Sequence, residues 1–488
     1  MDKLKFFFAF LLLFSNSIYG FAVQAALTRA VRETSTTPIR ERPVNPYAID
    51  VDLLIVGGTI VTMNAEREVI VNGAIGITNG KIDIMGTRNI VVKNTRPKRV
   101  INAAGKVIIP GLINTHTHVP MALFRGISDD LDLNDWLTKF IFPAEAKNVD
   151  EKFVRAGARL GMAEMIRGGT TTYCDMYYFE DAIAEETKKA GMRGVLGETI
   201  IQFPVSDNKT PTEAIAYTEK FIKRWQNDPL IVAAAAPHAP YTVSTDDLKK
   251  IREQSDRFNS PVIIHVAETK KERDDILAQY GKTPAEYLDS IGFLSNRTIA
   301  AHSVWLTPAE INIYKTRGVG SAHCPQSNMK LASGVAAIPA MLAADIAVGI
   351  GTDGAASNND LDMWDEMDSA AKLHKLTSND PKTLPAELAF EMATIRGARA
   401  LKLDKITGSL EAGKRADIVI VDMDSLNQTP YYNVYSALVY STKATDVRTV
   451  IINGRIVMLD RRLLTLNERA IKIDANAYRE KIIKSLGN

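Results

Sequence analysis

Short runs of aliphatic and β-branched residues alternate with longer amphipathic segments through the middle of the chain. Short apolar runs bounded by small or polar residues are typical of buried parallel strands, and apolar positions that recur every three or four residues are typical of helices covering them. Helices are clearest at residues 151–167 and 245–258. The pattern predicts eight strands, at residues 107–114, 170–175, 194–200, 231–237, 261–266, 298–302, 318–323 and 347–353.

Strict alternation of eight strands with helices over roughly 300 residues predicts an α/β fold, the (β/α)₈ TIM barrel. An open, doubly wound sheet is the alternative, because alternation along a sequence does not show that a sheet closes.

The segments on either side of this region have the pattern of β-hairpins. Residues 75–85 turn at Asn79-Gly80, residues 447–458 turn at Asn453-Gly454, and strand-like runs occupy residues 51–61 and 416–421. Asn-Gly supplies the two positive φ angles of a tight hairpin turn. We therefore predict a small β-sandwich from residues 51–108 and 407–460, a barrel from residues 109–406 and a helical tail from residues 461–488.

The N-terminus has the three parts of an export signal. Lys3 and Lys5 precede an apolar run at residues 6–14, and Val23-Gln24-Ala25 is the expected approach to a cleavage site. The run is shorter than the roughly 20 residues of a membrane span, so we expect no stable membrane insertion, although an uncleaved anchor is the alternative. We predict a signal peptide at residues 1–25, a linker at residues 26–50 and a bacterial protein that is periplasmic or secreted.

Composition narrows the classes of ligand. The 488 residues are 46% hydrophobic, which is enough for a large core, and the net charge of +2 comes from well-mixed charges without a basic stripe. We therefore expect a small-molecule substrate and no nucleic acid. Cys174 and Cys324 can form neither a disulfide framework nor a Cys-x-x-Cys zinc site. Whether the chain forms a homo-oligomer is left open.

The most informative motif lies at residues 110–118, Pro-Gly-Leu-Ile-Asn-Thr-His-Thr-His. Because side chains alternate along a strand, His116 and His118 point the same way while Thr117 turns aside, as two ligands of one metal require. On its own the pair is weak evidence, since histidines near a strand end are often surface or hydrogen-bonded groups.

The positions of the other candidate residues strengthen the metal hypothesis. Of the seven histidines, His238 follows the fourth predicted strand, His265 ends the fifth and His302 the sixth, and Asp353 ends the eighth. Active residues of such barrels lie at the C-terminal ends of the strands, so these groups are expected to face one mouth.

Four motifs stand out along the chain: residues 110–118, His265-Val-Ala-Glu268, Ala301-His302 and Gly351-Thr-Asp-Gly-Ala-Ala-Ser-Asn-Asn359. Together they resemble the amidohydrolase superfamily, and within it most closely the 5′-methylthioadenosine/S-adenosylhomocysteine deaminases. The resemblance extends from about residue 51 to residue 458 and implies a mononuclear metal, usually zinc, in a barrel with an attached β-sandwich.

The residues at the mouth fit the metal that this resemblance implies. His116, His118 and His265 supply neutral nitrogens and Asp353 a carboxylate, which leaves an open position for water, as in a catalytic zinc site. We expect each chain to bind one divalent transition metal ion, and we expect that ion to be zinc. Such a metal lowers the pKa of bound water towards about 7.

Three side chains have expected catalytic roles in the hydrolytic deamination of an aminopurine. Asp353 accepts the proton that water releases, and Glu268 protonates the ring nitrogen beside the attacked carbon. His302 hydrogen-bonds the attacking hydroxide and the developing oxyanion. Addition, proton transfer and loss of ammonia then give the oxo product.

The resemblance also implies a substrate-binding shell that includes Glu268 and Asp353 themselves. Trp136 offers an apolar face to the nucleoside, Glu145 accepts hydrogen bonds from two ribose hydroxyls, and His238 donates to a purine nitrogen. For Trp136, an ordinary core position is the alternative.

One departure from the related deaminases concerns the 5′ end of the substrate. Relatives that accept S-adenosylhomocysteine carry an arginine just after the third strand, whereas this chain has Glu198 there, with Lys209 as a compensating cation in the next loop. A carboxylate at that place repels a substrate carboxylate. We therefore expect methylthioadenosine, adenosine or 5′-deoxyadenosine to be preferred to S-adenosylhomocysteine.

Two other functions remain compatible with the sequence. Another hydrolase of the superfamily, such as a triazine hydrolase or a guanine deaminase, uses the same metal with a different pocket. A non-catalytic binding protein on a metal-free barrel is the second alternative, and the complete ligand set argues against it.

Overall fold

The computed structural model describes residue 45 and residues 47–486. The chain divides into two compact units, one ending at Ala48 and one beginning at Ile49, and the description below concerns the second. The predicted signal peptide and the linker as far as residue 44 lie outside the described residues.

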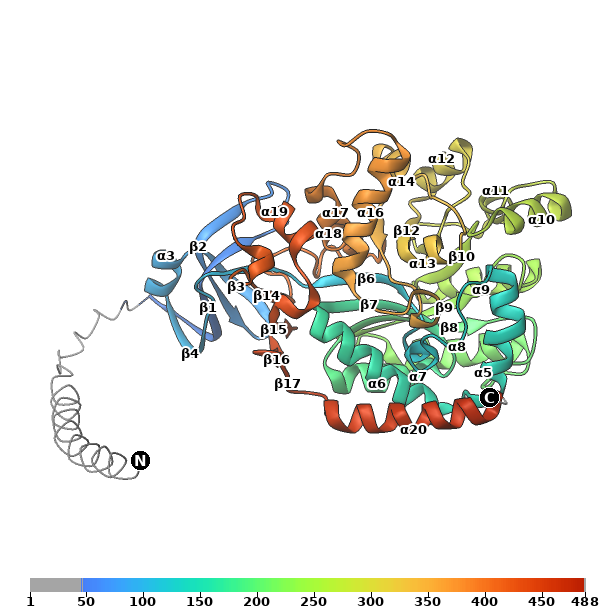
Figure 1. Cartoon of the computed structure of the whole chain (residues 1–488), viewed down its shortest axis with the longest axis horizontal. Coiled ribbons are helices and arrows are strands. Elements are labelled where there is room, and N and C mark those ends of the chain that lie inside the picture. The colour runs from blue at the N-terminus through green and yellow to red at the C-terminus, as the bar shows by residue number, and fades with distance from the viewer. Residues whose placement is uncertain (1–44, 46, 487–488) are drawn as a thin grey trace, which may run out of the picture. The chain divides into compact units, whose positions relative to one another are not determined.

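Eight parallel strands follow one another in sequence order around the barrel (Figure 1). The Asp353 N–H donates to the His116 carbonyl over 3.0 Å, which brings the segment after the last strand against the first. The predicted (β/α)₈ barrel is therefore confirmed, and the open doubly wound sheet was the wrong alternative. The strands are β6 (Leu112–Thr117), β7 (Thr170–Tyr177), β8 (Arg193–Ile200), β9 (Ile231–Pro237), β10 (Val262–Val266), β11 (Thr298–His302), β12 (Gly320–His323) and β13 (Val348–Ile350).

Helices that follow the strands surround the barrel, and several of them begin at a side-chain cap. The side chains of Asp150, Thr210 and Ser244 each accept a backbone N–H from the first turn of the helix that follows. Gly169, at φ +90°, ends the first long helix in a left-handed conformation. The helices are α6 (Glu151–Gly168), α7 (Glu180–Ala190), α8 (Pro211–Trp225), α9 (Thr245–Phe258), α10 (Lys270–Tyr280), α11 (Pro284–Ser290), α12 (Pro308–Arg317), α13 (Pro325–Lys330), α14 (Ile338–Ala343), α15 (Ala355–Asn358), α16 (Met363–Thr377), α17 (Ala386–Met392) and α18 (Ile395–Ala400).

The first predicted strand, residues 107–114, is wrong as a single element. The chain forms β5 (Lys106–Pro110) in a second sheet, passes Gly111 and then enters the barrel as β6. A Cβ at Gly111 would lie 2.0 Å from the Thr171 Oγ1 atom, so the crossing requires glycine. An unbroken apolar run cannot show that its two halves belong to different sheets, because both are buried.

The second sheet is mixed and combines segments from both ends of the chain (Figure 1). Ile77 and Ile82 near one end of the strand order share a hydrophobic core with Ile418 and Ile451 near the other, so the sheet curls over itself as the predicted sandwich. Both Asn-Gly turns occur as predicted. The elements are β1 (Ile49–Val61), β2 (Val69–Thr78), β3 (Lys81–Thr87), α3 (Arg88–Lys93), β4 (Thr95–Asn102), β5, β14 (Ile418–Asp422), β15 (Val447–Ile452), β16 (Arg455–Leu459) and β17 (Arg462–Leu463).

A C-terminal helix, α20 (Glu468–Leu486), lies along α6 (Figure 1). The Tyr478 ring meets Phe153 of α6 with centroids 5.5 Å apart. The Asn148 Nδ2 atom donates to the Ser485 Oγ atom over 2.7 Å, which ties the end of α20 to the wall of the barrel mouth. Short helices complete the chain: η1 (Val119–Phe124), α4 (Leu133–Asp135), η2 (Trp136–Ile141), α5 (Phe142–Asn148), η3 (Leu426–Gln428), α19 (Val434–Ser436), η4 (Ala437–Ser441) and η5 (Ala444–Asp446).

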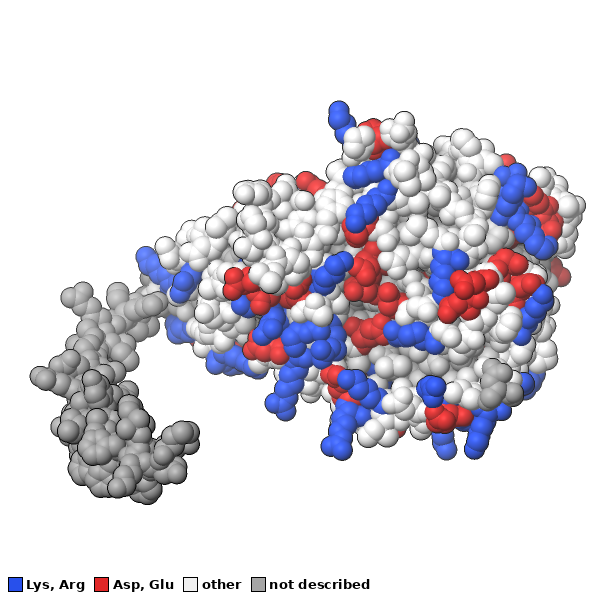
Figure 2. Space-filling view, viewed as in Figure 1, with Lys and Arg blue, Asp and Glu red and all other residues white. Residues whose placement is uncertain are grey.

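Charges of both signs are interspersed over the face drawn in Figure 2. Many are paired along helices, as Lys270 with Asp274 and Lys271 with Asp275 on α10. Among residue 45 and residues 47–486, no helix is both long enough and apolar enough to cross a bilayer.

Candidate metal centre and active site

His118 and His265 are each held by a backbone carbonyl that determines which ring nitrogen faces the centre. Their Nδ1 atoms lie 2.7 Å from the Met176 carbonyl and 2.8 Å from the His238 carbonyl, and both therefore carry hydrogen. In the neutral rings the Nε2 lone pairs then face each other across 3.4 Å. Two buried lone pairs at this distance repel each other unless a proton or a metal ion lies between them, so the pair is a site for a cation and the residues present fit a metal.

Asp353 closes the same centre from the loop three residues after β13, which ends at Ile350 rather than at the predicted residue 353. Its Oδ1 atom lies 3.4 Å from the His116 Nε2 atom and 3.3 Å from the His118 Nε2 atom, and one ligand atom from each residue lies within 4.8 Å of the others. Within the described residues, neither ring nitrogen of the fully buried His116 has a hydrogen-bond partner. The structure thus brings together His116, His118, His265 and Asp353, the ligand set expected from sequence.

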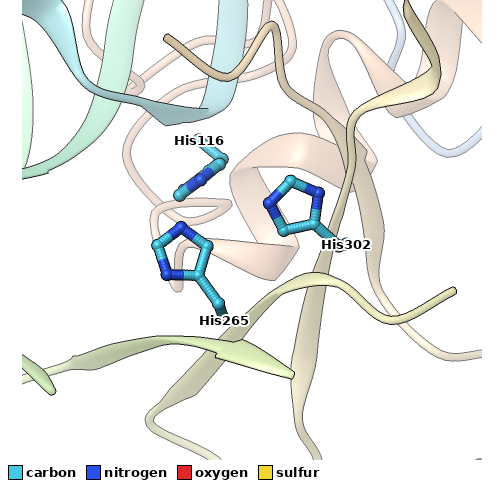
Figure 3. A group of neighbouring side chains, drawn as sticks. All are labelled: His116, His265 and His302. Carbon is cyan, nitrogen blue, oxygen red and sulfur yellow. The ribbon is translucent and has the colours of Figure 1, made fainter. Parts of the chain in front are cut away.

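His302, at the end of β11, lies at the edge of this centre. It forms a second group of possible ligands with His116 and His265, again with ligand atoms within 4.8 Å of one another (Figure 3). The ring centroids of His116 and His302 are 5.4 Å apart. His302 is therefore close enough to contact a water held at the centre, and also close enough to be a ligand itself.

Burial and the nearby carboxylate set the protonation of these groups. Burial lowers the pKa of His116 to about 4 and the pKa of His265 well below its usual range, so both rings are neutral and can bind a metal. For His118, burial also lowers the pKa, but contact with Asp353 outweighs it and raises the pKa to about 9. A metal must displace the His118 proton, which couples metal binding to proton release.

Glu268 lies just beyond β10 with its side chain in the mouth of the barrel. The Ala267 and Glu268 N–H groups donate to the two carboxylate oxygens of Glu272 over 2.7 and 2.8 Å, which fixes the turn. The Glu268 Oε2 atom is 3.7 Å from the His302 Nε2 atom. Burial raises the pKa of Glu268, so this carboxyl group retains a proton more readily than an exposed glutamate, as a general acid requires.

A cavity opens directly above these groups and contains the predicted substrate shell. Trp136, 6% exposed, begins η2, a π-helix, and Glu145 follows one helix later in α5. The Tyr177 hydroxyl donates to the Glu145 Oε1 atom over 2.7 Å, and burial raises the pKa of Glu145 to about 7. The cavity is lined by His118, Trp136, Glu145, His238, His265, Glu268, His302 and Asp353, with aliphatic residues, aromatic residues and Thr199 completing the wall, whereas His116 lies behind it.

A second cavity of about 140 Å³ adjoins the first and shares Glu145, Phe142 and Tyr178 with it. The loop after β8 forms its other side and contributes Phe203 and Lys209. The Lys209 Nζ atom donates to a backbone carbonyl, that of Val205, over 2.9 Å. This cavity is therefore lined both by the predicted ribose carboxylate, Glu145, and by the ammonium group of Lys209.

The predicted contact of Glu198 with the substrate is wrong. Glu198 is fully buried and lies on the face of β8 that carries Leu196 and Ile200, whereas Thr199 lines the cavity. Its carboxylate accepts the Asn208 Nδ2 hydrogen over 2.9 Å and the Glu180 N–H over 3.1 Å. Glu198 therefore anchors the loop after β8 from the helix layer and cannot repel a substrate carboxylate.

Several supporting residues were not identified from sequence. Ser327 and Ser357 donate to the Asp353 Oδ2 atom over 2.7 and 2.9 Å, and Asn328 bonds the His302 ring. Asp175 accepts from the Thr117 hydroxyl over 2.6 Å. Single serine, asparagine and aspartate residues carry no pattern of their own, so only their partners in space reveal these roles.

Comparisons with known proteins agree with this geometry. The amidohydrolase family matches residues 107–457. A 5-methylthioadenosine/S-adenosylhomocysteine deaminase of Syntrophus aciditrophicus is 43% identical over 437 residues, which cover 90% of this chain and 99% of the relative. A 5′-deoxyadenosine deaminase of Methanosphaera stadtmanae is 44% identical over 390 residues, which cover 80% and 91%.

A solved structure with bound zinc is also similar to this chain. It is an adenosine deaminase from Xanthomonas campestris, with a TM-score of 0.88 and 39% sequence identity, over 90% of this chain and 100% of that one. The histidine cluster, the zinc in this neighbour and the family indicate a metal in the present centre. The family match and the deaminase relatives lead to one conclusion: the chain belongs to the amidohydrolase family and is a hydrolase that acts on C–N bonds.

Proposed function

We propose that the protein is a metal-dependent deaminase that converts an adenine nucleoside to its inosine analogue and ammonia. The observation that carries the proposal is that the ligand atoms of His116, His118 and Asp353 lie together with the His265 ring against them, while the buried Glu268 lines the cavity beside them. The similarity to deaminases of adenosine-type nucleosides supports this substrate class.

His116, His118, His265 and Asp353 would hold one zinc ion per chain. When bound, the ion would act as a Lewis acid that lowers the pKa of water and so makes it nucleophilic near pH 7. Glu268 would donate a proton to the ring nitrogen beside the attacked carbon, since its burial favours the protonated form. Asp353 would accept the proton released by water, and the His302 Nε2 atom, whose partner nitrogen is bonded to Asn328, would accept a hydrogen bond from the attacking water.

The cavity supports a nucleoside rather than a free base. Trp136 would pack against the nucleoside, and Glu145, already bonded to Tyr177, would accept hydrogen bonds from ribose hydroxyls. The His238 Nδ1 atom lies 3.0 Å from the Thr242 hydroxyl. His238 would donate to a purine nitrogen in the tautomer with hydrogen on Nε2, in which the Thr242 hydroxyl donates to Nδ1 rather than to the Ala239 carbonyl.

The adjoining cavity would receive the 5′ substituent of the nucleoside. Methylthio, hydroxyl and methyl groups would meet Phe142, Tyr178 and Phe203, while a substituent that ends in a carboxylate would meet Lys209. Because Glu198 lies outside both cavities, S-adenosylhomocysteine joins methylthioadenosine, adenosine and 5′-deoxyadenosine among the proposed substrates. We also propose that the mature protein acts in the periplasm or outside the cell, on the basis of the sequence of residues 1–25.

A screen for ammonia release tests the proposal. The purified mature protein would be assayed with adenine nucleosides, free purines, guanine, pterins and triazines, before and after chelation of metal and re-addition of zinc. We expect turnover of adenine nucleosides that falls on chelation and returns with zinc. Turnover of only guanine or triazines, or full activity in metal-free protein, would overturn it.

A further inference from the structure

The short helix α13 lies behind the metal centre and contacts two catalytic groups with neighbouring side chains. Ser327 donates to Asp353, and the Asn328 Oδ1 atom lies 2.9 Å from the His302 Nδ1 atom. Asn328 and His302 are each 1% exposed. A hydrogen bond between two buried side chains is protected from competing water, so it can fix a ring orientation.

The backbone of His302 is already fixed in an unusual conformation. Its φ is +65° and that of Ser303 is +52°, both in the left-handed region that such residues rarely adopt. Hydrogen bonds from Ser303 to the Val266 carbonyl and from Val304 to the Ala267 carbonyl, each 3.0 Å long, hold this turn. Such strain persists only where the surrounding structure determines it, and here it directs the imidazole towards the centre.

The backbone does not fix the rotation of the imidazole ring about the Cβ–Cγ bond, so a side-chain contact must do so. Among the described residues, Asn328 is the hydrogen-bond partner recorded for the His302 ring, since the Glu268 carboxylate at 3.7 Å is too distant to bond. With the amide oriented as in the structure, its oxygen accepts only, and the His302 Nδ1 atom would then carry hydrogen. In the neutral ring the Nε2 atom then presents a lone pair to the centre.

The Asn328 amide therefore determines which His302 nitrogen is protonated. Its Nδ2 atom is buried without a hydrogen-bond partner among the described residues. If the amide were reversed, that NH₂ group would donate to Nδ1 and place the hydrogen on Nε2 instead. We propose that Asn328 is a positioning residue that fixes the ring plane of His302 and holds its hydrogen on Nδ1. The inference about catalysis rests on the proposed deaminase function, but the inference about the ring does not.

The ring can be examined directly in the purified protein labelled with ¹⁵N-histidine. Long-range ¹H–¹⁵N correlation spectra distinguish the two tautomers, and a His302→Gln variant identifies the signals that belong to His302. We expect hydrogen on Nδ1 in the wild-type protein and a mixture or reversal in Asn328→Ala. Hydrogen on Nε2 in the wild-type protein, or an unchanged ring in Asn328→Ala, would overturn the proposal.

Kinetics then test what the orientation does. We expect Asn328→Ala to keep its metal and to lower kcat by about 10- to 100-fold, the usual scale for loss of such an outer-shell partner. KM should stay within about threefold, because ground-state binding is untouched. Asn328→Asp retains an acceptor and should restore part of kcat, while Met329→Ala, whose side chain is 44% exposed on the same helix, should behave as wild type.

The two proposals fail in different ways. If no nucleoside is deaminated but His302 carries hydrogen on Nδ1, only the proposed function fails. If nucleosides are deaminated and Asn328→Ala has normal kcat, the positioning role fails. If Asn328→Ala does not fold, as judged by circular dichroism, the wild-type spectrum and the Asn328→Asp kinetics decide.

Discussion

Glu268 combines burial with a position beside the centre, which is the environment that a proton donor needs. Its pKa is raised chiefly by desolvation, and the neighbouring turn is held by Glu272. Desolvation disfavours the charged carboxylate, so this side chain holds its proton to a higher pH than an exposed glutamate and can pass it to the substrate.

Replacement of Glu268 by glutamine should separate proton transfer from shape. We expect Glu268→Gln to retain its metal and to lower kcat by at least about a hundredfold, because the amide cannot shuttle the proton. Steady-state kinetics and metal analysis measure both quantities. Glu253→Gln, an exposed position on α9, is the control, and near-normal turnover in Glu268→Gln would remove this residue from the mechanism.

Lys209 is the residue at which substrate preference can be tested. Loss of its charge in Lys209→Met should lower kcat/KM for S-adenosylhomocysteine by about 10- to 100-fold, the equivalent of roughly 1 to 3 kcal/mol, and leave methylthioadenosine unchanged. The paired rates on one preparation give the comparison. Lys220→Met, on the exposed side of α8, is the matched control. Equal losses for both substrates would contradict recognition of the carboxylate.

At the scale of elements, a histidine pair joins β12 to α16. The Nε2 atoms of His323 and His374 are 3.1 Å apart, so one ring donates to the other, and both side chains are buried. Burial lowers the pKa of His374 to about 4 and the pKa of His323 well below its usual range. Protonation of both rings would break this link, because both nitrogens would then be donors.

The pair predicts a loss of stability in acid. The unfolded chain binds a proton at His374 near its ordinary pKa of 6.5, whereas the folded chain binds it only near about 4, so stability falls as pH decreases through this window. At pH 5 the loss from this one residue is on the order of 2 kcal/mol. Urea unfolding of wild type and His374→Gln between pH 7 and pH 4.5 measures it. The variant should show the smaller dependence on pH, and equal slopes would contradict the prediction.

At the scale of the whole molecule, a buried ion pair connects the sandwich to the barrel. Arg193 of β8 meets Asp417, just before β14, with the Arg193 Nη2 and Asp417 Oδ2 atoms 3.0 Å apart and both side chains almost fully buried. Asp417 also accepts the Asn453 N–H over 2.6 Å. Because a buried charge without its partner is costly, this pair ties the position of the C-terminal hairpin to the base of the barrel.

Export is the prediction that concerns the whole chain. The charged, apolar and small-residue parts of residues 1–25 predict cleavage after Ala25. Fractionation of the native bacterial host followed by N-terminal sequencing should find mature protein outside the cytoplasm, beginning near Ala26. An intact Met1 on cytoplasmic protein would refute export, and an intact Met1 on membrane-bound protein would identify the uncleaved anchor instead.

Periodicity and local turn chemistry were sufficient for the fold class and most elements. The bounds of β9, β11 and α9 agree with those predicted, because the spacing of their apolar residues and the residues that flank them define where each element begins and ends. The metal-centre residues were identified because a barrel brings the ends of all its strands to one mouth. Residues that end successive strands in the sequence therefore lie close together at the mouth of the barrel.

Tertiary structure alone decided which face of a strand meets the substrate and which distant groups are paired. Glu198 and Thr199 are neighbours in sequence, yet one lies in the helix layer and the other lines the cavity. A shift of one position exchanges the two faces of a strand, and a strand such as β8 that is buried on both faces has no alternation of apolar and polar residues to show which face is which. The pairing of Asn328 with His302 spans 26 residues and depends on how α13 packs. The sequence thus determined which residues form the active site, and tertiary packing determined the direction in which each side chain points.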